Sequence, residues 1–288
     1  MKNLWNKKIA NEYIKKYAKK NISKDLALRI YTTHLLGSEK KLVLHGGGNT
    51  SLKETQKDIF NKKTNVMHVK GSGWDMSNLT EEGMPTVFLN PLIKTLKFKK
   101  MTDENMVNYL RNNLLNSSSP NPSVETLLHA FLPHKYIDHT HSNAILSLVN
   151  LENSNTILKK IFGNKLAIVP YVMPGFDLAK ICYQIYNKNK KVEGLLLLNH
   201  GIFTFAATAE DSYKRMIKYV TIAENFIKKC KLKSKKINSV INKNNNFDIG
   251  KLQNQIRKIY YNSTNIKWII KHNGNKEDIL LSNNKNLK

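Results

Sequence analysis

The pattern of hydrophobic and polar positions predicts three long helices, at residues 5–19, 24–36 and 208–230. In the first of them, apolar side chains recur every fourth residue, at Trp5, Ile9, Tyr13 and Tyr17. Ser23 and Thr208 stand just before the second and third helices, where a hydroxyl can cap the first free amides. The stretch VETLLHAFL, which follows the turn-rich NSSSPNPS, predicts a further helix.

Short apolar or alternating stretches between these helices have the pattern of β-strands, and they cover LVLHGGGNTSLK and residues 65–70, 136–141, 166–172 and 194–206. Helices and strands mixed in this order predict a layered α/β domain over residues 1–230. Beyond it, KLKSKKINSVINKNNN is rich in lysine and asparagine, which indicates a linker. We therefore expect residues 231–288 to form a linker and a C-terminal extension with one helix and one strand.

The formal net charge of +26 raises the question of a nucleic-acid partner, because basic patches neutralise phosphates. The basic residues are nearly all lysines spread along the chain, and the arginines stand only at Arg29, Arg111, Arg215 and Arg257. Recognition of phosphates and bases relies on the bidentate arginine fork. We interpret the charge as a solvated basic surface and predict no nucleic-acid partner.

The cysteine content and the hydropathy of the chain indicate the cellular compartment in which we expect the protein. Cys182 and Cys230 are the only cysteines, so neither a disulfide framework nor a cysteine-based zinc site is available. The N-terminus is charged throughout and lacks the apolar core of a signal peptide. No apolar run approaches the roughly 20 residues that span a bilayer. These features predict a cytoplasmic protein with no membrane partner.

The motif DHTHS places two histidines in a predicted strand between apolar segments. Strand side chains alternate between faces, so His139 and His141 point the same way and Thr140 points the other. Two converging imidazoles suit a first-row metal ion. A pair of hydrogen-bonded polar residues at the end of a strand would give the same pattern.

His200 lies in GLLLLNHGIFTF, where we expect it in the middle of a buried strand pair. A buried imidazole without partners is costly, whereas a metal satisfies one ring nitrogen. Three such histidines could form the open site of a catalytic zinc. Glu125 follows Ser123 at a helix start, so it is either a capping carboxylate or a group beside the metal that ligates it or takes a proton.

Two glycine turns each follow a predicted strand and carry hydroxyl groups. HGGGNTS and GSG lack the endings of nucleotide-binding loops. Backbone N–H groups in such turns can hold an anion, which favours a phosphate over an ordinary turn at both places.

Six motifs, in order, together resemble the class II aldolase/adducin family: HGGGNTS, VKGSGWD, PSVETLLHAFLPH, DHTHS, VPYVMPG and LLLLNHGIFTF. The resemblance covers residues 3–230 and is closest to the aldolase half of bifunctional rhamnulose-1-phosphate aldolase/short-chain dehydrogenase proteins. It implies a three-layer α/β/α domain with a central, largely antiparallel sheet. It also implies a homotetramer with one zinc, or another divalent metal, in each subunit.

The resemblance implies a role for each matching residue. His139, His141 and His200 match the metal ligands, and Glu125 matches the ligand and catalytic base. The residues that match the phosphate site are Gly48, Asn49, Gly71, Ser72, Gly73 and Ser123. Tyr171 resembles a proton donor from a neighbouring subunit, although a tyrosine at a strand end is commonly a packing residue. Val124 departs from the family, which often has a second serine directly before the acid.

The activity implied is cleavage of an L-ketose 1-phosphate, such as rhamnulose 1-phosphate, to dihydroxyacetone phosphate and a small aldehyde such as L-lactaldehyde. A 4-epimerase or dehydratase at the same metal is an alternative, because each of these reactions begins by polarising a carbonyl. A non-catalytic, adducin-like interaction protein is a further alternative, though it would have no physical reason to keep the metal ligands. No glycine-rich dinucleotide motif follows residue 230, so we expect no NAD-dependent activity; nicotinamide binding by the purified protein would contradict this.

Overall fold

The computed structural model describes residues 1–57, 60–230 and 249–264, and the chain divides into two units, Met1–Cys230 and Lys231–Lys288. The strands of the first unit are β1 (Asn49–Lys57), β2 (Lys63–Val69), β3 (Thr86–Phe88), β4 (Tyr136–Thr140), β5 (Leu166–Val169), β6 (Gly194–Leu197) and β7 (Gly201–Ala206). Its helices are α1 (Lys7–Ala18), α2 (Lys24–Gly37), α3 (Leu89–Lys94), α4 (Asp103–Asn112), α5 (Thr126–Phe131), α6 (Asn143–Val149), α7 (Ser154–Phe162), α8 (Phe176–Lys188) and α9 (Ala209–Lys229).

The second unit contains α10 (Ile249–Thr264) in its described part. The linker predicted for residues 231–246 and the strand predicted after the helix lie outside the described residues. None of the helices described here is both long and apolar enough to cross a bilayer.

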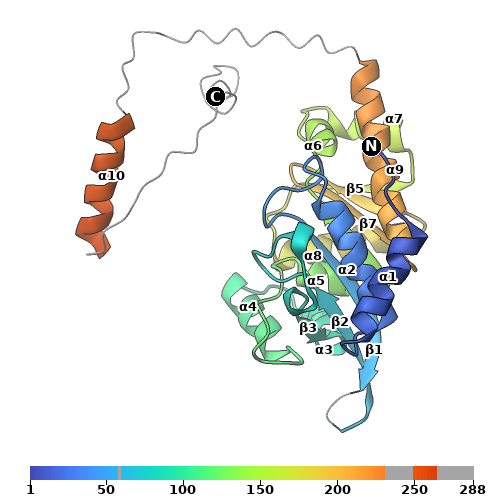
Figure 1. The fold of residues 1–288 in the computed structure, drawn as a ribbon. Coiled ribbons are helices and arrows are strands. Elements are labelled where there is room, and N and C mark those ends of the chain that lie inside the picture. The colour runs from blue at the N-terminus through green and yellow to red at the C-terminus, as the bar shows by residue number, and fades with distance from the viewer. Residues whose placement is uncertain (58–59, 231–248, 265–288) are drawn as a thin grey trace, which may run out of the picture. The chain divides into compact units, whose positions relative to one another are not determined.

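A single mixed sheet organises the first unit (Figure 1), with the strand order β3-β2-β1-β4-β7-β6-β5. Neighbouring strands are antiparallel except for β5 and β6. β4 is the central strand, and Asn49 of β1 and Phe203 of β7 lie on either side of its residue His139. The largely antiparallel sheet predicted from the sequence is confirmed.

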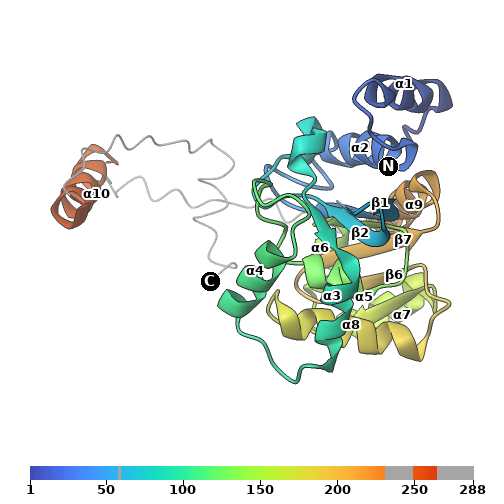
Figure 2. The same cartoon turned by 90° about the horizontal axis from the view of Figure 1, so that it is seen from below.

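Helices cover both faces of the sheet (Figure 2), with α1 and α2 on one side and α3, α5 and α8 on the other. Because strand side chains alternate, Ile202 faces a core shared with α2, α6, α7 and α9, whereas Phe203 and Phe205 face a core shared with α3, α4, α5 and α8. The expected three layers are therefore present.

Two of the predicted helices begin at the caps that the sequence indicates. The Ser23 hydroxyl accepts a hydrogen bond from the amide of Leu26 at the start of α2. The Thr208 hydroxyl likewise accepts one from the amide of Asp211 at the start of α9. Each bond satisfies one of the amides that the first turn of a helix leaves free.

The stretch 194–206 is a hairpin rather than one continuous run of strand. β6 and β7 are joined by a turn at residues 198–200, in which Asn199 has a φ of 55°. Asparagine tolerates this left-handed conformation better than most residues. His200 therefore lies in a turn at the end of the strands, so the expectation of a place within a buried strand pair is wrong.

The other face of β4 carries a buried ion pair. Asp138 points away from its neighbour His139, and its Oδ1 lies 2.5 Å from Nη2 of Arg29, with both side chains fully buried. Ser212 of α9 donates its hydroxyl to the second oxygen of Asp138, at 2.5 Å. The pair ties the central strand to α2 and α9.

Replacing Asp138 by alanine should cost about 3–5 kcal/mol of unfolding free energy, since it leaves a buried guanidinium without its counter-charge. The double change Arg29→Met with Asp138→Leu should cost less, because it leaves no isolated charge. Urea denaturation would measure both, with Glu210→Ala as a control that breaks the exposed Lys214–Glu210 pair. A loss for Asp138→Ala as small as that of the control would contradict the prediction.

Candidate metal and phosphate site

Three histidine side chains meet at the ends of β4 and the β6–β7 hairpin. His139 is the penultimate residue of β4, His141 follows directly after the strand, and His200 comes from the hairpin turn. Their ligand nitrogens all lie within 4.8 Å of one another. Nε2 of His139 is 2.9 Å from Nε2 of His141. The structure therefore brings together the three histidines that the sequence could not join by spacing.

Close packing of glycines around the rings holds this arrangement. A Cβ added to Gly201 would lie 2.5 Å from the carbonyl oxygen of Thr140 and 3.2 Å from the rings of His139 and His141. Gly48 has a φ of 64°, and a Cβ there would lie 2.8 Å from the carbonyl oxygen of His139. Side chains at either position would push against the strand that carries the histidines.

His139 and His141 are held in the neutral form, which is the form that binds metal ions. Burial holds the pKa of His139 well below its ordinary value and also lowers the pKa of His141. Nδ1 of His139 donates to the carbonyl of Ile202 at 3.0 Å, which leaves Nε2 as the ligand atom. Neutral imidazoles with one nitrogen free are what a divalent metal requires.

Glu125 lies beside two of the histidines. Its Oε2 is 3.3 Å from Nε2 of His139, and its Oε1 is 3.2 Å from Nε2 of His200. Burial alone would raise the pKa of this carboxyl, but His139, His200 and a hydrogen bond from Asn49 outweigh it and hold the pKa well below the usual range. Glu125 occupies the position before α5 and its side chain makes no capping bond, so the carboxylate faces the histidines instead.

Asn49 and Ser123 complete the buried cluster around Glu125. The Asn49 amide donates to Oε2 of Glu125 at 2.6 Å and to the hydroxyl of Ser123 at 3.0 Å. His129 contacts the other end of the Asn49 amide. His129 was not predicted from the sequence, where the signal was a polar residue one helical turn after Glu125 in a largely apolar helix.

The second glycine turn has fewer free backbone N–H groups than the sequence predicted. The N–H of Gly71 donates to Gly83 at 2.8 Å, and that of Ser72 donates to Asn121 at 2.8 Å. Within the described part of the chain, the N–H of Gly73 and the Ser72 hydroxyl are left for an anion. This turn offers two donors where the sequence suggested a full backbone cradle.

Lys70 is a second residue that sequence analysis missed, and it joins the two glycine turns. Its buried ammonium donates to the carbonyl of Gly46 at 3.0 Å in the first turn, and to those of Gly71 at 3.2 Å and Trp74 at 2.6 Å in the second. Its position at the end of a predicted strand, directly before GSG, was the available signal. The ammonium fixes the spacing of the turns and adds a positive charge beneath them.

These residues fit a bound divalent metal. Three imidazoles converge, and among the described residues two buried atoms of the cluster, Oε1 of Glu125 and Nδ1 of His200, lack a hydrogen-bond partner. Imidazole suits zinc and several other divalent metals. Three protein ligands leave a coordination position for substrate, as catalytic zinc sites do.

Comparison with known proteins identifies the family. Residues 28–227 match the family described as Class II Aldolase and Adducin N-terminal domain. The chain belongs to the class II aldolase and adducin family. A protein of Bacillus subtilis named uncharacterized oxidoreductase YuxG is 40% identical over 198 residues, which is 69% of this chain. The match spans only 29% of that longer protein.

Solved structures of this family share the fold. The N-terminal class II aldolase domain of a conserved protein from Thermoplasma acidophilum is 38% identical, with a TM-score of 0.70, and the alignment covers 79% of this chain and 99% of that one. A sugar-phosphate aldolase from Thermotoga maritima is 15% identical, with a TM-score of 0.54, over 72% and 95% of the two chains. The latter shows a common fold alone.

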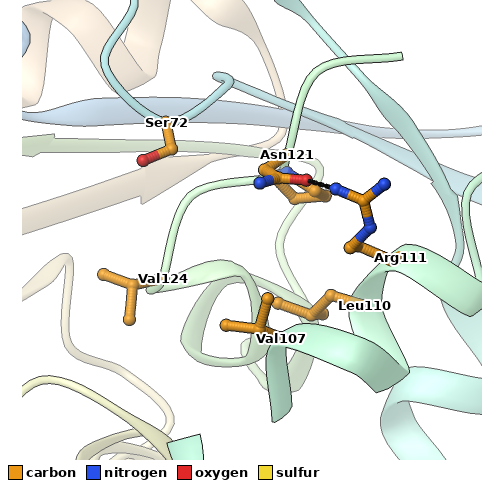
Figure 3. Close-up of a pocket in the computed structure, with 7 residues that line it drawn as sticks. Ser72, Val107, Leu110, Arg111, Asn121 and Val124 are labelled. Atoms are coloured by element: carbon orange, nitrogen blue, oxygen red, sulfur yellow. Dashed lines mark hydrogen bonds between the residues drawn. The ribbon is translucent and has the colours of Figure 1, made fainter. Parts of the chain in front are cut away.

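Val124, the departure from the family motif, lines a pocket beside the second glycine turn. Figure 3 shows Val107, Leu110 and Val124 on one side of this pocket of about 120 Å³, with Ser72 and Asn121 on the other. The Val124 side chain is 44% exposed. An apolar wall therefore replaces the hydroxyl that the family often has before its acidic residue.

Tyr171 is not brought into the cluster within one chain. Its side chain is 54% exposed, and its hydroxyl donates to Sδ of Met173 at 3.4 Å rather than to a residue of the site. The predicted role concerns a neighbouring subunit, so it stays a prediction.

Proposed function

We propose that this protein is a metal-dependent class II aldolase that cleaves an L-ketose 1-phosphate to dihydroxyacetone phosphate and a small aldehyde, with L-rhamnulose 1-phosphate and L-lactaldehyde as the model pair. The observation that carries the proposal is the buried Glu125 carboxylate, which lies within 3.3 Å of two of the three converging histidines. Cleavage of a carbon–carbon bond next to a carbonyl requires a metal ion that polarises the carbonyl and an ionised base that takes up a proton.

Different residues of the site carry out different steps of the proposed reaction. His139, His141 and His200 would hold zinc or another divalent ion, which supplies the Lewis acidity that polarises the substrate carbonyl. Glu125 accepts the proton of the C4 hydroxyl as the C3–C4 bond breaks and the aldehyde forms. It then returns a proton to C3, which yields dihydroxyacetone phosphate. Asn49 holds the carboxylate in place through both transfers.

The glycine turns bind the phosphate and so fix the reacting end of the sugar. Candidate donors are the Ser72 hydroxyl and the Gly73 amide of the second turn, together with Gly48 of the first turn. The first turn is held beside the histidines, since Gly48 packs against the carbonyl of His139. Fixing the phosphate places C3 and C4 against the base, and such positioning lowers a reaction barrier by several kcal/mol.

The charge of Lys70 predicts a pH dependence of phosphate binding. Burial lowers the pKa of Lys70 to about 8, against the opposing charges of Asp75 and Glu125. The ammonium is therefore positive below about pH 8 and loses its charge as the pH rises through this value. We expect KM for the phosphorylated substrate to rise in that range.

The variant Lys70→Met tests this dependence. It should have a raised KM at pH 7 that changes little between pH 7 and 9, because the titrating charge is gone. Steady-state kinetics across this range would measure it. A wild-type KM that is constant from pH 7 to 9 would contradict the prediction.

We further propose a homotetramer in which Tyr171 reaches the site of a neighbouring subunit and donates a hydrogen bond to the C4 oxygen while Glu125 takes the proton of that hydroxyl. The exposure of Tyr171, at 54%, and of Met173, at 72%, supports a surface that a second subunit covers. Analytical ultracentrifugation would test the assembly. A monomer with full activity would contradict it.

Metal analysis joined to a substrate panel tests the proposed function. The purified protein should carry about one divalent ion per chain and release dihydroxyacetone phosphate from one member of a panel of L- and D-ketose 1-phosphates. A coupled reaction that traps dihydroxyacetone phosphate would detect this. Conversion of a sugar phosphate to its C4 epimer or to a dehydrated product would replace the aldolase proposal by the corresponding epimerase or dehydratase. Absence of both metal and conversion would reject an enzyme at this site.

A further inference from the structure

A line of buried hydrogen bonds runs from the sheet to the proposed base. The Ser51 hydroxyl is 2.7 Å from Nδ1 of His129, and Nε2 of His129 is 2.5 Å from Oδ1 of Asn49. The Asn49 amide nitrogen then donates to Oε2 of Glu125 at 2.6 Å. These four side chains are buried, and His129 is fully so.

The direction of each bond follows from chemistry. An ionised carboxylate only accepts, so the NH₂ group of Asn49 must face Glu125 and its oxygen must face His129. That oxygen also only accepts, so Nε2 of His129 must carry a proton. Burial lowers the pKa of His129 to about 3, so the ring is neutral and holds a single proton. Nδ1 therefore accepts from the hydroxyl of Ser51.

We propose that His129 is a positioning residue, which fixes the orientation of the Asn49 amide and thereby directs the Glu125 carboxylate toward His139 and His200. The inference rests on the proposed function, because it assigns His129 a role in aiming the base. If the Asn49 amide turned over, its oxygen would face the carboxylate and repel it. A proton on Nε2 of His129 prevents this, since the NH₂ group of a reversed amide would then meet a donor.

The geometry separates this role from that of an ordinary core histidine. His129 does pack on the sheet, with its ring 5.4 Å from that of Phe203 in an edge-on arrangement. Packing alone would be preserved by an apolar side chain of similar size. The two ring nitrogens, however, are both bonded, and one of them meets a group that contacts the proposed base.

Paired substitutions in the metal-loaded chain test the proposal. His129→Met removes the ring donor, and we expect kcat to fall about 10- to 100-fold, as for other partners that orient a ligand or base. KM and the metal content should stay near the wild-type values, because the phosphate turns and the three histidine ligands are unchanged. His129→Gln places an NH₂ group near the lost Nε2 and should restore most of kcat.

A matched control is His134→Met. His134 stacks on Phe205, with ring centroids 4.0 Å apart, and has no bond to Asn49. The same substitution there should reduce stability but not kcat. Equal losses of kcat in the two Met variants, or a failure of His129→Gln to exceed His129→Met, would overturn the positioning role.

A spectroscopic measurement keeps this inference separate from the proposed function. In protein labelled with ¹⁵N at histidine and loaded with zinc, without substrate, the His129 ring should show a protonated Nε2 and an unprotonated Nδ1 from pH 5 to 8. An imidazolium or the opposite tautomer would overturn the inference even if the enzyme is an aldolase. If the predicted tautomer is found in a protein that cleaves no ketose phosphate, the chain of hydrogen bonds from Ser51 to Glu125 is supported. The aldolase proposal fails in that case.

Discussion

Replacing His141 by alanine is expected to remove both metal binding and cleavage. The three ligand nitrogens lie within 4.8 Å of one another, so loss of one leaves two imidazoles and a gap where the third was. Removing even one charge-stabilising donor typically lowers kcat by roughly 10²–10³-fold. We expect cleavage to fall by at least about a thousandfold, since the group lost here would hold the metal itself.

Metal content after dialysis and the rate of dihydroxyacetone phosphate release would be measured on the same sample. His45→Asn is a suitable control, because His45 is an exposed histidine with a φ of 50° in the neighbouring loop, and asparagine tolerates that backbone conformation. It should keep one metal per chain. Full activity of His141→Ala without bound metal would show that the histidines serve another purpose.

Changing Glu125 to glutamine should lower kcat by about 10²–10⁴-fold, the range typical of a lost general base. Glutamine has nearly the same shape, so the three imidazoles and the phosphate turns stay in place. Its amide cannot take a proton at neutral pH, whereas the carboxylate of Glu125 is ionised because its pKa is held low. KM should change little, since the base acts on the reacting carbon atoms rather than on the phosphate.

The same variant distinguishes the two roles beside the metal, ligand and base, that the sequence left open for Glu125. Retained metal with lost kcat indicates a base, whereas loss of metal indicates a ligand. Glu82→Gln, at an exposed glutamate, is the matched control and should change neither quantity. A Glu125→Gln protein with kcat within twofold of the wild type would exclude both roles.

Local patterns in the sequence were sufficient to predict much of the fold and part of the candidate site. The alternation in DHTHS predicted that His139 and His141 share a face, because a strand has a period of two whatever surrounds it. Helix starts at Ser23 and Thr208 were predicted for a similarly local reason, since a cap bonds amides only two or three residues away. The family motifs then connected His200 and Glu125 to this strand.

Contacts between distant segments were beyond such reasoning. Asn49 and Glu125 are 76 positions apart and meet because β1 pairs with β4 while α5 packs below. Lys70 and His129 gave only weak local signals, since a lysine beside a turn and a histidine in a helix are both common. The turn at His200 was missed because an apolar run on both sides of a polar trio resembles one long strand.

The metal site and the walls of the pocket lie on different elements of the fold, which matters for protein engineering. β4 carries both His139 and the buried Asp138, so random change there loses folding and metal together. Val107, Leu110 and Val124 lie instead on α4 and the loop before α5, and none of them contributes a metal ligand or the buried ion pair. A library that varies the exposed Val107 and Val124 and keeps the buried core residue Leu110 can therefore reshape the pocket beside the second glycine turn while the metal centre and the folding of the sheet stay constant.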